Sequence, residues 1–177
     1  MRTPRTARPA PKSRIVLRPP TSRDQPAFVR AARASRALHG AWVHAPDTPL
    51  AFRAYLRRMA APGQHAFLVC RRDSGAIVGA INISNVVMGL FRSAYLGYFA
   101  FAGHERQGLM REGLQAVVRH AFGRLKLHRL EANIQPGNAP SIALVKACGF
   151  SMEGYSPRYL KIAGRWRDHE RWAIVAS

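Results

Sequence analysis

Residues 93–125 constrain the fold more than any other part of this sequence, because they combine a strand, a short loop and a long helix. Residues 93–101, SAYLGYFAF, are aromatic and apolar, which is typical of a strand. The turn-like sequence AGHERQG follows, and from Gly108 to about Leu125 apolar residues recur at helical spacing. Free N–H groups at a helix start bind phosphate, and a glycine lets a ligand approach the backbone closely. We therefore expect an anion site at this junction, although a plain strand-to-helix turn fits the same residues.

The order of the predicted elements indicates one mixed sheet with helices on both of its faces. Apolar runs and turn signals predict strands over residues 13–18, 66–70, 76–87, 93–101, 128–135, 150–161 and 165–175. Helical spacing and cap signals predict helices from Thr21 to His39, from Pro49, from Gly108 and after Asn138. The resulting order, β-α-α-β-β-β-α-β-α-β-β, belongs to the α/β or α+β class, with about seven strands.

Length and charge suggest one domain preceded by a basic tail. The 177 residues suffice for one domain that buries its own core. We expect residues 1–13, which are basic and rich in proline, to be a disordered tail, and residues 14–177 to be the folded domain. The tail is interpreted as a solvated segment, with an RNA-binding arm and a transit peptide as alternatives. The net charge of +19 attracts polyanions such as nucleic acid.

Cysteine content and hydropathy indicate where the protein is located. Cys70 and Cys148 lie far apart in a chain without a secretory signal, so we expect two reduced thiols and a cytoplasmic protein. No apolar run approaches the length that spans a bilayer, so we expect no membrane association. The histidines show no metal-ligand spacing, and we expect no metal.

Several segments together resemble the GNAT superfamily of N-acetyltransferases, and within it the ribosomal-protein alanine N-acetyltransferases of the RimJ/RimL type. The resemblance runs from about residue 15 to residue 174. It is densest in the segments YLGY, QGLMREGL, HRLEANIQPGNAPSIALVKACGF, EGY and GRWRDHERWA. It implies the GNAT acyl-CoA N-acyltransferase fold and acetyl-CoA as co-substrate, with direct attack of an amine on the thioester.

The resemblance also implies where acetyl-CoA binds. In this family the strand before the phosphate loop splays away from the strand after the helix, and pantetheine pairs with the first strand, here Phe99, Ala100 and Phe101. The pyrophosphate rests on the loop and helix start, here Arg106, Gln107, Gly108, Leu109, Met110 and Arg111. Asn138 and Ser141 match positions near the pantetheine arm and the thioester. Glu105 replaces a residue that is usually Gln or Arg, so we predict weaker but intact CoA binding.

Two residues are candidates for proton transfer. Glu153 is the candidate base, directly or through water. A salt-bridged surface carboxylate is the alternative interpretation of Glu153. Ser141 is the candidate proton donor to the CoA thiolate, and the alternative is a helix-start serine that binds backbone amides. Both assignments depend on the resemblance for their place near the acetyl group.

The acceptor is predicted from the chemistry of amines. A free α-amine has a pKa of about 7.7–8.0 and a lysine about 10.4, so an α-amine needs less help to become neutral. The absence of an obvious strong base favours a protein N-terminal α-amine. A small-molecule amine is the alternative acceptor, and a non-catalytic protein that binds CoA or RNA is the alternative function. Contact with the ribosome or RNA through the basic surface, and a monomer or a homodimer, are compatible with the sequence.

Overall fold

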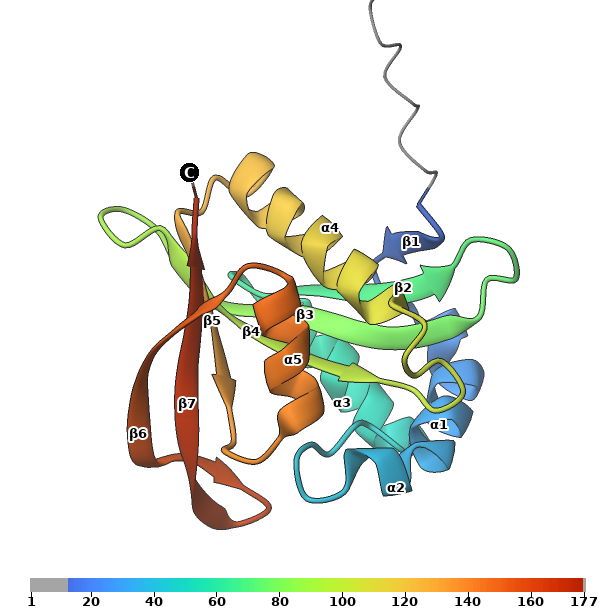
Figure 1. Ribbon diagram of the computed structural model, residues 1–177. Helices are drawn as coiled ribbons and strands as arrows, with labels where there is room; N and C mark the ends of the chain where they lie inside the picture. The colour runs from blue at the N-terminus through green and yellow to red at the C-terminus, as the bar shows by residue number, and fades with distance from the viewer. Residues whose placement is uncertain (1–12, 177) are drawn as a thin grey trace, which may run out of the picture.

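The computed structural model describes residues 13–176, which form one seven-stranded sheet with helices on both faces (Figure 1). The strands are β1 (Ile15–Arg18), β2 (His65–Arg71), β3 (Ile77–Val87), β4 (Ser93–Ala100), β5 (Arg129–Ile134), β6 (Ser151–Ile162) and β7 (Arg165–Val175). The helices are η1 (Ser22–Asp24), α1 (Gln25–Ala34), α2 (Arg36–His39), α3 (Pro49–Met59), α4 (Leu109–Gly123) and α5 (Ala139–Ala147). The predicted tail, residues 1–13, lies outside the described residues except for Ser13, and the domain limits stay a prediction.

The sheet has the order β1-β2-β3-β4-β5-β7-β6, and only the β4–β5 pair is parallel. The crossover between these two strands is α4, as a parallel connection requires. The predicted mixed sheet of seven strands is therefore confirmed. Among residues 13–176, no helix is long and apolar enough to cross a membrane.

Two hydrophobic cores lie on opposite faces of the sheet. One packs α4 and α5 against the strands, with Leu114 and Val145 fully buried. The other packs α1 and α3 against β2, β3 and β4, with Phe28 and Tyr55 at its centre. Successive side chains of a strand point to opposite faces of the sheet, so the same strands contribute alternate residues to the two cores.

The helix predicted from Thr21 to His39 is broken into η1, α1 and α2. Its predicted start is confirmed, because the backbone N–H of Thr21 donates to Asp24 Oδ2 at 2.7 Å. The break at Ser35 is explained by tertiary contacts, since this buried hydroxyl accepts the backbone N–H of Ala102 at 2.8 Å. This hydrogen bond holds the α1–α2 junction against the chain just beyond β4.

Candidate active site

Strands β4 and β5 pair for only four residues and then part. The register runs from Ser93 opposite Arg129 to Leu96 opposite Ala132, and β4 continues to Ala100 without β5 beside it. Figure 1 shows the two strands diverging, with β5 running downward beside α5 and β4 running to the right behind it. Beyond Leu96, the backbone groups of β4 that point toward β5 therefore pair with no strand.

The direction of the β4 backbone groups follows from their pairing with β3. The N–H of Phe101 donates to Val78 O at 2.7 Å, so Phe101 and Phe99 direct their backbone groups at β3. Tyr98 and Ala100 direct their backbone N–H and C=O groups to the opposite edge of β4. This edge faces the gap where β4 beyond Leu96 separates from β5 beyond Ala132, which we call the parting. His39 Nε2 contacts Ala100 O at 2.8 Å, which confirms this direction and occupies that carbonyl.

The pairing of pantetheine with Phe99, Ala100 and Phe101 stays a prediction, and the register shows which backbone groups of β4 are free for it. Phe99 and Phe101 have their backbone groups on β3, and their side chains are buried in the α1–α3 core. The N–H of Ala100 points to the parting and is free, whereas its C=O binds His39. Tyr98 directs both its N–H and its C=O to the parting. Sequence reasoning missed this alternation because it requires the strand register.

The start of α4 presents free amides next to this edge. Gly108 has φ +75°, a left-handed conformation that favours glycine, and it precedes the helix. The first helical hydrogen bond joins Glu112 N–H to Gly108 O at 3.1 Å. The amides of Leu109, Met110 and Arg111 therefore have no acceptor within the helix. The side chain of Leu109 is buried, so this residue offers only its backbone.

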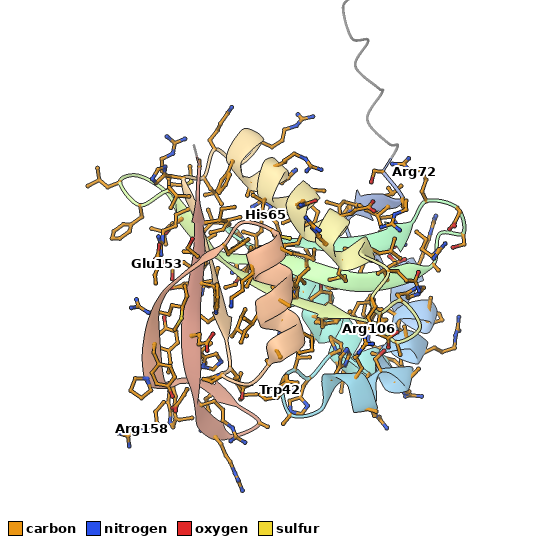
Figure 2. The ribbon with its side chains drawn as sticks, viewed as in Figure 1. Trp42, His65, Arg72, Arg106, Glu153 and Arg158 are labelled. Atoms are coloured by element: carbon orange, nitrogen blue, oxygen red, sulfur yellow. The ribbon has the colours of Figure 1, made fainter. Side chains whose placement is uncertain are left out.

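The loop before α4 is braced by Arg14, which directly precedes β1, and by Arg71 at the end of β2. Arg14 Nη2 donates to Gln107 O at 2.9 Å, and Arg71 Nη1 donates to Gln107 Oε1 at 3.1 Å. Glu105 Oε2 accepts the N–H of Gly103 at 2.8 Å, so this acid already occupies one loop amide. The arginines line a cavity of about 540 Å³ on the β1–β2 side of the loop, not between β4 and β5. Arg106, on the same loop, is exposed (Figure 2).

A parallel strand pair that parts beside free helix-start amides is the arrangement expected from the sequence. A family model described as an acetyltransferase (GNAT) domain matches residues 14–151. The chain belongs to the GNAT acetyltransferase family. This match covers the splayed strands, the loop and both helices of the site.

Individual GNAT relatives agree with the family match. Probable N-acetyltransferase YjcK of Bacillus subtilis is 32% identical over 121 residues, 68% of this chain and 67% of its own length. The ribosomal protein uS5-alanine N-acetyltransferase of Escherichia coli is 43% identical over 103 residues, 58% of this chain. The aligned part is 53%, about half, of that enzyme.

A solved structure extends the likeness to nearly the whole chain. Mycobacterium smegmatis RimJ, in complex with CoA-disulfide, superposes with a TM-score of 0.84 at 30% identity. The superposition covers 92% of this chain and 82% of that one. The predicted family, fold and N-acetyltransferase class are confirmed.

The two α5 candidates lie at the start of that helix in this GNAT chain. Asn138 caps α5, because its Oδ1 accepts the N–H of Ser141 at 3.3 Å. The Ser141 hydroxyl does not bind a backbone amide but lies 2.7 Å from the hydroxyl of Tyr98. Tyr98 comes from β4 beyond its last pairing with β5, and sequence reasoning did not single it out.

Glu153 does not lie at the parting of the strands. Both of its carboxylate oxygens accept from the guanidinium of Arg129, which holds the pKa of Glu153 below its usual value. A carboxyl with a lowered pKa is a weaker base. Glu153 sits on β6, two strands from β5, and Figure 2 shows it at the left of the view, whereas Arg106 lies at the right. This ion pair with Arg129 fits the alternative interpretation, a salt-bridged surface carboxylate, and the role of Glu153 as base stays a prediction.

Two polar residues of β5, Glu131 and Asn133, lie nearer to the parting. Leu130 and Ala132 face the α4–α5 core, so Glu131 and Asn133 face the other side of the sheet. Glu131 is opposite Tyr95, one pair before the strands separate, and accepts from Arg129 Nε at 2.8 Å. Within residues 13–176, Asn133 Oδ1 is buried and has no hydrogen-bond donor. An unsatisfied acceptor at this position suits a donor on a substrate.

Metal ligation has no support in the described part of the chain. Among residues 13–176, no group of three or more His, Cys, Asp or Glu side chains is placed to hold a metal ion. Cys70 and Cys148 are free thiols, and burial raises the pKa of both. Neither thiol is therefore activated as a nucleophile.

The helix start can be tested at Gly108. We expect Gly108→Val to weaken acetyl-CoA binding by about tenfold or more, because a branched side chain strains this left-handed position and covers the amides. The control is Gly89→Val, since Gly89 has φ +70° at the β3–β4 turn with open space around it. Isothermal titration calorimetry should give wild-type affinity for the control alone. Equal affinities for both variants would place the ligand elsewhere.

The two carboxylates that share Arg129 can be compared directly. We expect Glu153→Gln to keep the acetyl-transfer rate within about twofold of wild type, because its carboxylate lies away from the parting. Glu131→Gln should also keep the rate within about twofold, because Arg129 binds this carboxylate as well and stabilises its charged form. Steady-state kinetics from pH 6 to 9 measure both. A loss of about tenfold or more for Glu153→Gln alone would support Glu153 as the base.

Proposed function

We propose that this chain transfers the acetyl group of acetyl-CoA directly to the N-terminal α-amine of a protein. The observation that carries the proposal is the parting of β4 from β5 beside the free amides of α4. An extended edge and a helix start next to each other suit a ligand that combines an amide-bearing arm with a pyrophosphate. We also propose a cytoplasmic location, as the sequence predicts.

The residues present fit acetyl-CoA. The backbone amides from Arg106 to Arg111 would hold the pyrophosphate, and Gly108 places no side chain at the helix start, where the Arg14 guanidinium lies close by. The backbone groups of Tyr98 and Ala100 would pair with the amides of the pantetheine arm. Glu105 occupies the Gly103 amide and adds a negative charge, which supports weaker binding than a loop without an acid would give.

Acetyl transfer then needs a neutral amine and a hydrogen-bond donor that stabilises the negative charge developing on the thioester carbonyl oxygen. A backbone N–H at the parting can stabilise the developing oxyanion, and Ser141 can supply a proton to the departing thiolate. The carboxylates nearby are already engaged, since Glu131 and Glu153 both bind Arg129. A site without a free strong base favours an acceptor that is neutral near pH 7, and an α-amine meets this need. The similar enzyme of E. coli is named for an alanine N-terminus, which supports the same acceptor class.

The outer face of the α1–α3 layer supports a polyanionic partner, and we assign RNA of the ribosome to it. Neither helix contains an acidic residue, and Arg30, Arg33, Arg53 and Arg57 are exposed on them. The nearest acids are already paired, Asp24 with Arg18 and Asp47 with Arg36. Guanidinium groups without carboxylate partners bind phosphodiesters well.

Acceptor class can be tested with a panel of amines. We expect turnover with peptides that begin with alanine or serine and none with the same peptides after N-terminal blocking. The rate should rise to about pH 8 and then level off, because an α-amine of pKa about 7.7–8.0 is by then neutral. Release of free CoA thiol measures the rate. A rate that still climbs above pH 9, or turnover with small amines alone, would assign a lysine or small-molecule acceptor. Turnover at the blank rate across the panel would favour a non-catalytic binding protein.

The arginine face can be tested by charge reversal. We expect Arg30→Glu combined with Arg53→Glu to lower the affinity for a fluorescent RNA hairpin by about tenfold or more at low salt. Arg119→Glu on α4 with Arg124→Glu directly after that helix changes the net charge equally on the other face and should have a smaller effect. Fluorescence anisotropy at several salt concentrations measures both. Equal losses would mean that only the total charge matters.

A further inference from the structure

The hydroxyl of Tyr98 meets the hydroxyl of Ser141 across the parting of the strands. Their oxygens lie 2.7 Å apart, and the Tyr98 hydroxyl is also 3.4 Å from Ser141 O. Tyr98 belongs to β4 beyond Leu96, and Ser141 lies in the first turn of α5. The ring of Tyr98 packs against the α4–α5 core, which fixes the position of its hydroxyl.

The phenol is the natural donor in this pair. Burial raises the pKa of Tyr98 to about 12, so it keeps its proton throughout the neutral range. A phenol is also a stronger hydrogen-bond donor than an aliphatic alcohol, because it is the more acidic of the two. With Tyr98 donating to Ser141 Oγ, the proton of the serine hydroxyl is free to point elsewhere.

We propose that Tyr98 is a positioning residue for the acetyl-transfer reaction, which orients the Ser141 hydroxyl so that its proton is directed at the departing sulfur. The proposal rests on the proposed function, because Ser141 has a donor role only if a thioester is cleaved at this place. Tyr98 itself keeps its proton. Its hydrogen bond stabilises Ser141 Oγ while that oxygen is short of its own proton.

The step balances without any further reactant. The amine nitrogen forms a bond to the carbonyl carbon, the carbon–sulfur bond breaks, and the sulfur leaves with the electron pair. The sulfur takes the Ser141 proton, and Ser141 regains one from water. The nitrogen sheds one proton to water, so the total number of protons is unchanged. Tyr98 therefore affects the height of the barrier and not the stoichiometry.

The test is a double-mutant cycle at Tyr98 and Ser141. Tyr98→Phe removes only the hydroxyl and keeps the packed ring. We expect it to lower kcat by about tenfold while the KM for acetyl-CoA changes by less than about twofold, because ground-state contacts remain. Ser141→Ala should lower kcat at least as much, and the double variant should match Ser141→Ala, because Tyr98 acts only through Ser141. The loss in Tyr98→Phe should be the same factor from pH 6 to 9.

The control is Tyr55→Phe, which removes another buried hydroxyl. Tyr55 donates to Asn82 Oδ1 at 2.7 Å within the α1–α3 core, so its loss tests a purely structural effect. We expect a lower melting temperature with kcat near wild type. Several results would overturn the role of Tyr98: an unchanged kcat in Tyr98→Phe, a raised KM with normal kcat, or losses that multiply in the double variant. A wild-type protein without turnover would overturn the proposed function as well, whereas normal wild-type turnover isolates the result at Tyr98.

Discussion

Strands β4 and β5 pair for four residues and then separate. The candidate site depends on the edge of β4 beyond Leu96, whose backbone groups have no neighbouring strand. Backbone N–H and C=O groups must be satisfied when they are buried, so an edge of this kind needs partners. The break at Ser35 supplies some of them, since Ser35 binds the amide of Ala102 and His39 binds the carbonyl of Ala100. The groups of Tyr98 and the N–H of Ala100 remain directed at the parting. An extended chain with its own amides is the chemical partner that such an edge accepts.

The carboxylates of the chain are all engaged, which shapes the reaction it can carry out. Each of the nine accepts at least one hydrogen bond from the protein, from Asp24 bound to Arg18 to Glu170 bound to Trp172. A hydrogen bond from an arginine lowers the pKa of a carboxyl, as it does at Asp24, Asp73 and Glu153. The surplus arginines stay available for anions. Both facts support an acceptor that loses its proton easily and a partner rich in phosphate.

Local signals in the sequence predicted the elements and the loop, whereas contacts between distant residues were out of reach. Gly108 and Asn138 could be assigned because a left-handed turn and a helix cap are determined by neighbouring residues. The inward direction of the Phe101 backbone depends on the β3–β4 register. The pairing of Glu153 with Arg129 joins residues 24 positions apart, and the Tyr98–Ser141 contact joins residues 43 apart. Such pairs follow from the folded sheet and have no local pattern.

The central claim, that a pantetheine arm pairs with the free edge of β4, is tested most directly by amide hydrogen exchange. Nuclear magnetic resonance can follow the amides of Ala100 and Phe99 with and without saturating acetyl-CoA. The Ala100 amide faces the parting, so its exchange should slow markedly when the ligand binds, whereas the Phe99 amide, which faces β3, should change little. Unchanged exchange at Ala100 under saturating ligand would mean that the arm binds elsewhere and would contradict this account.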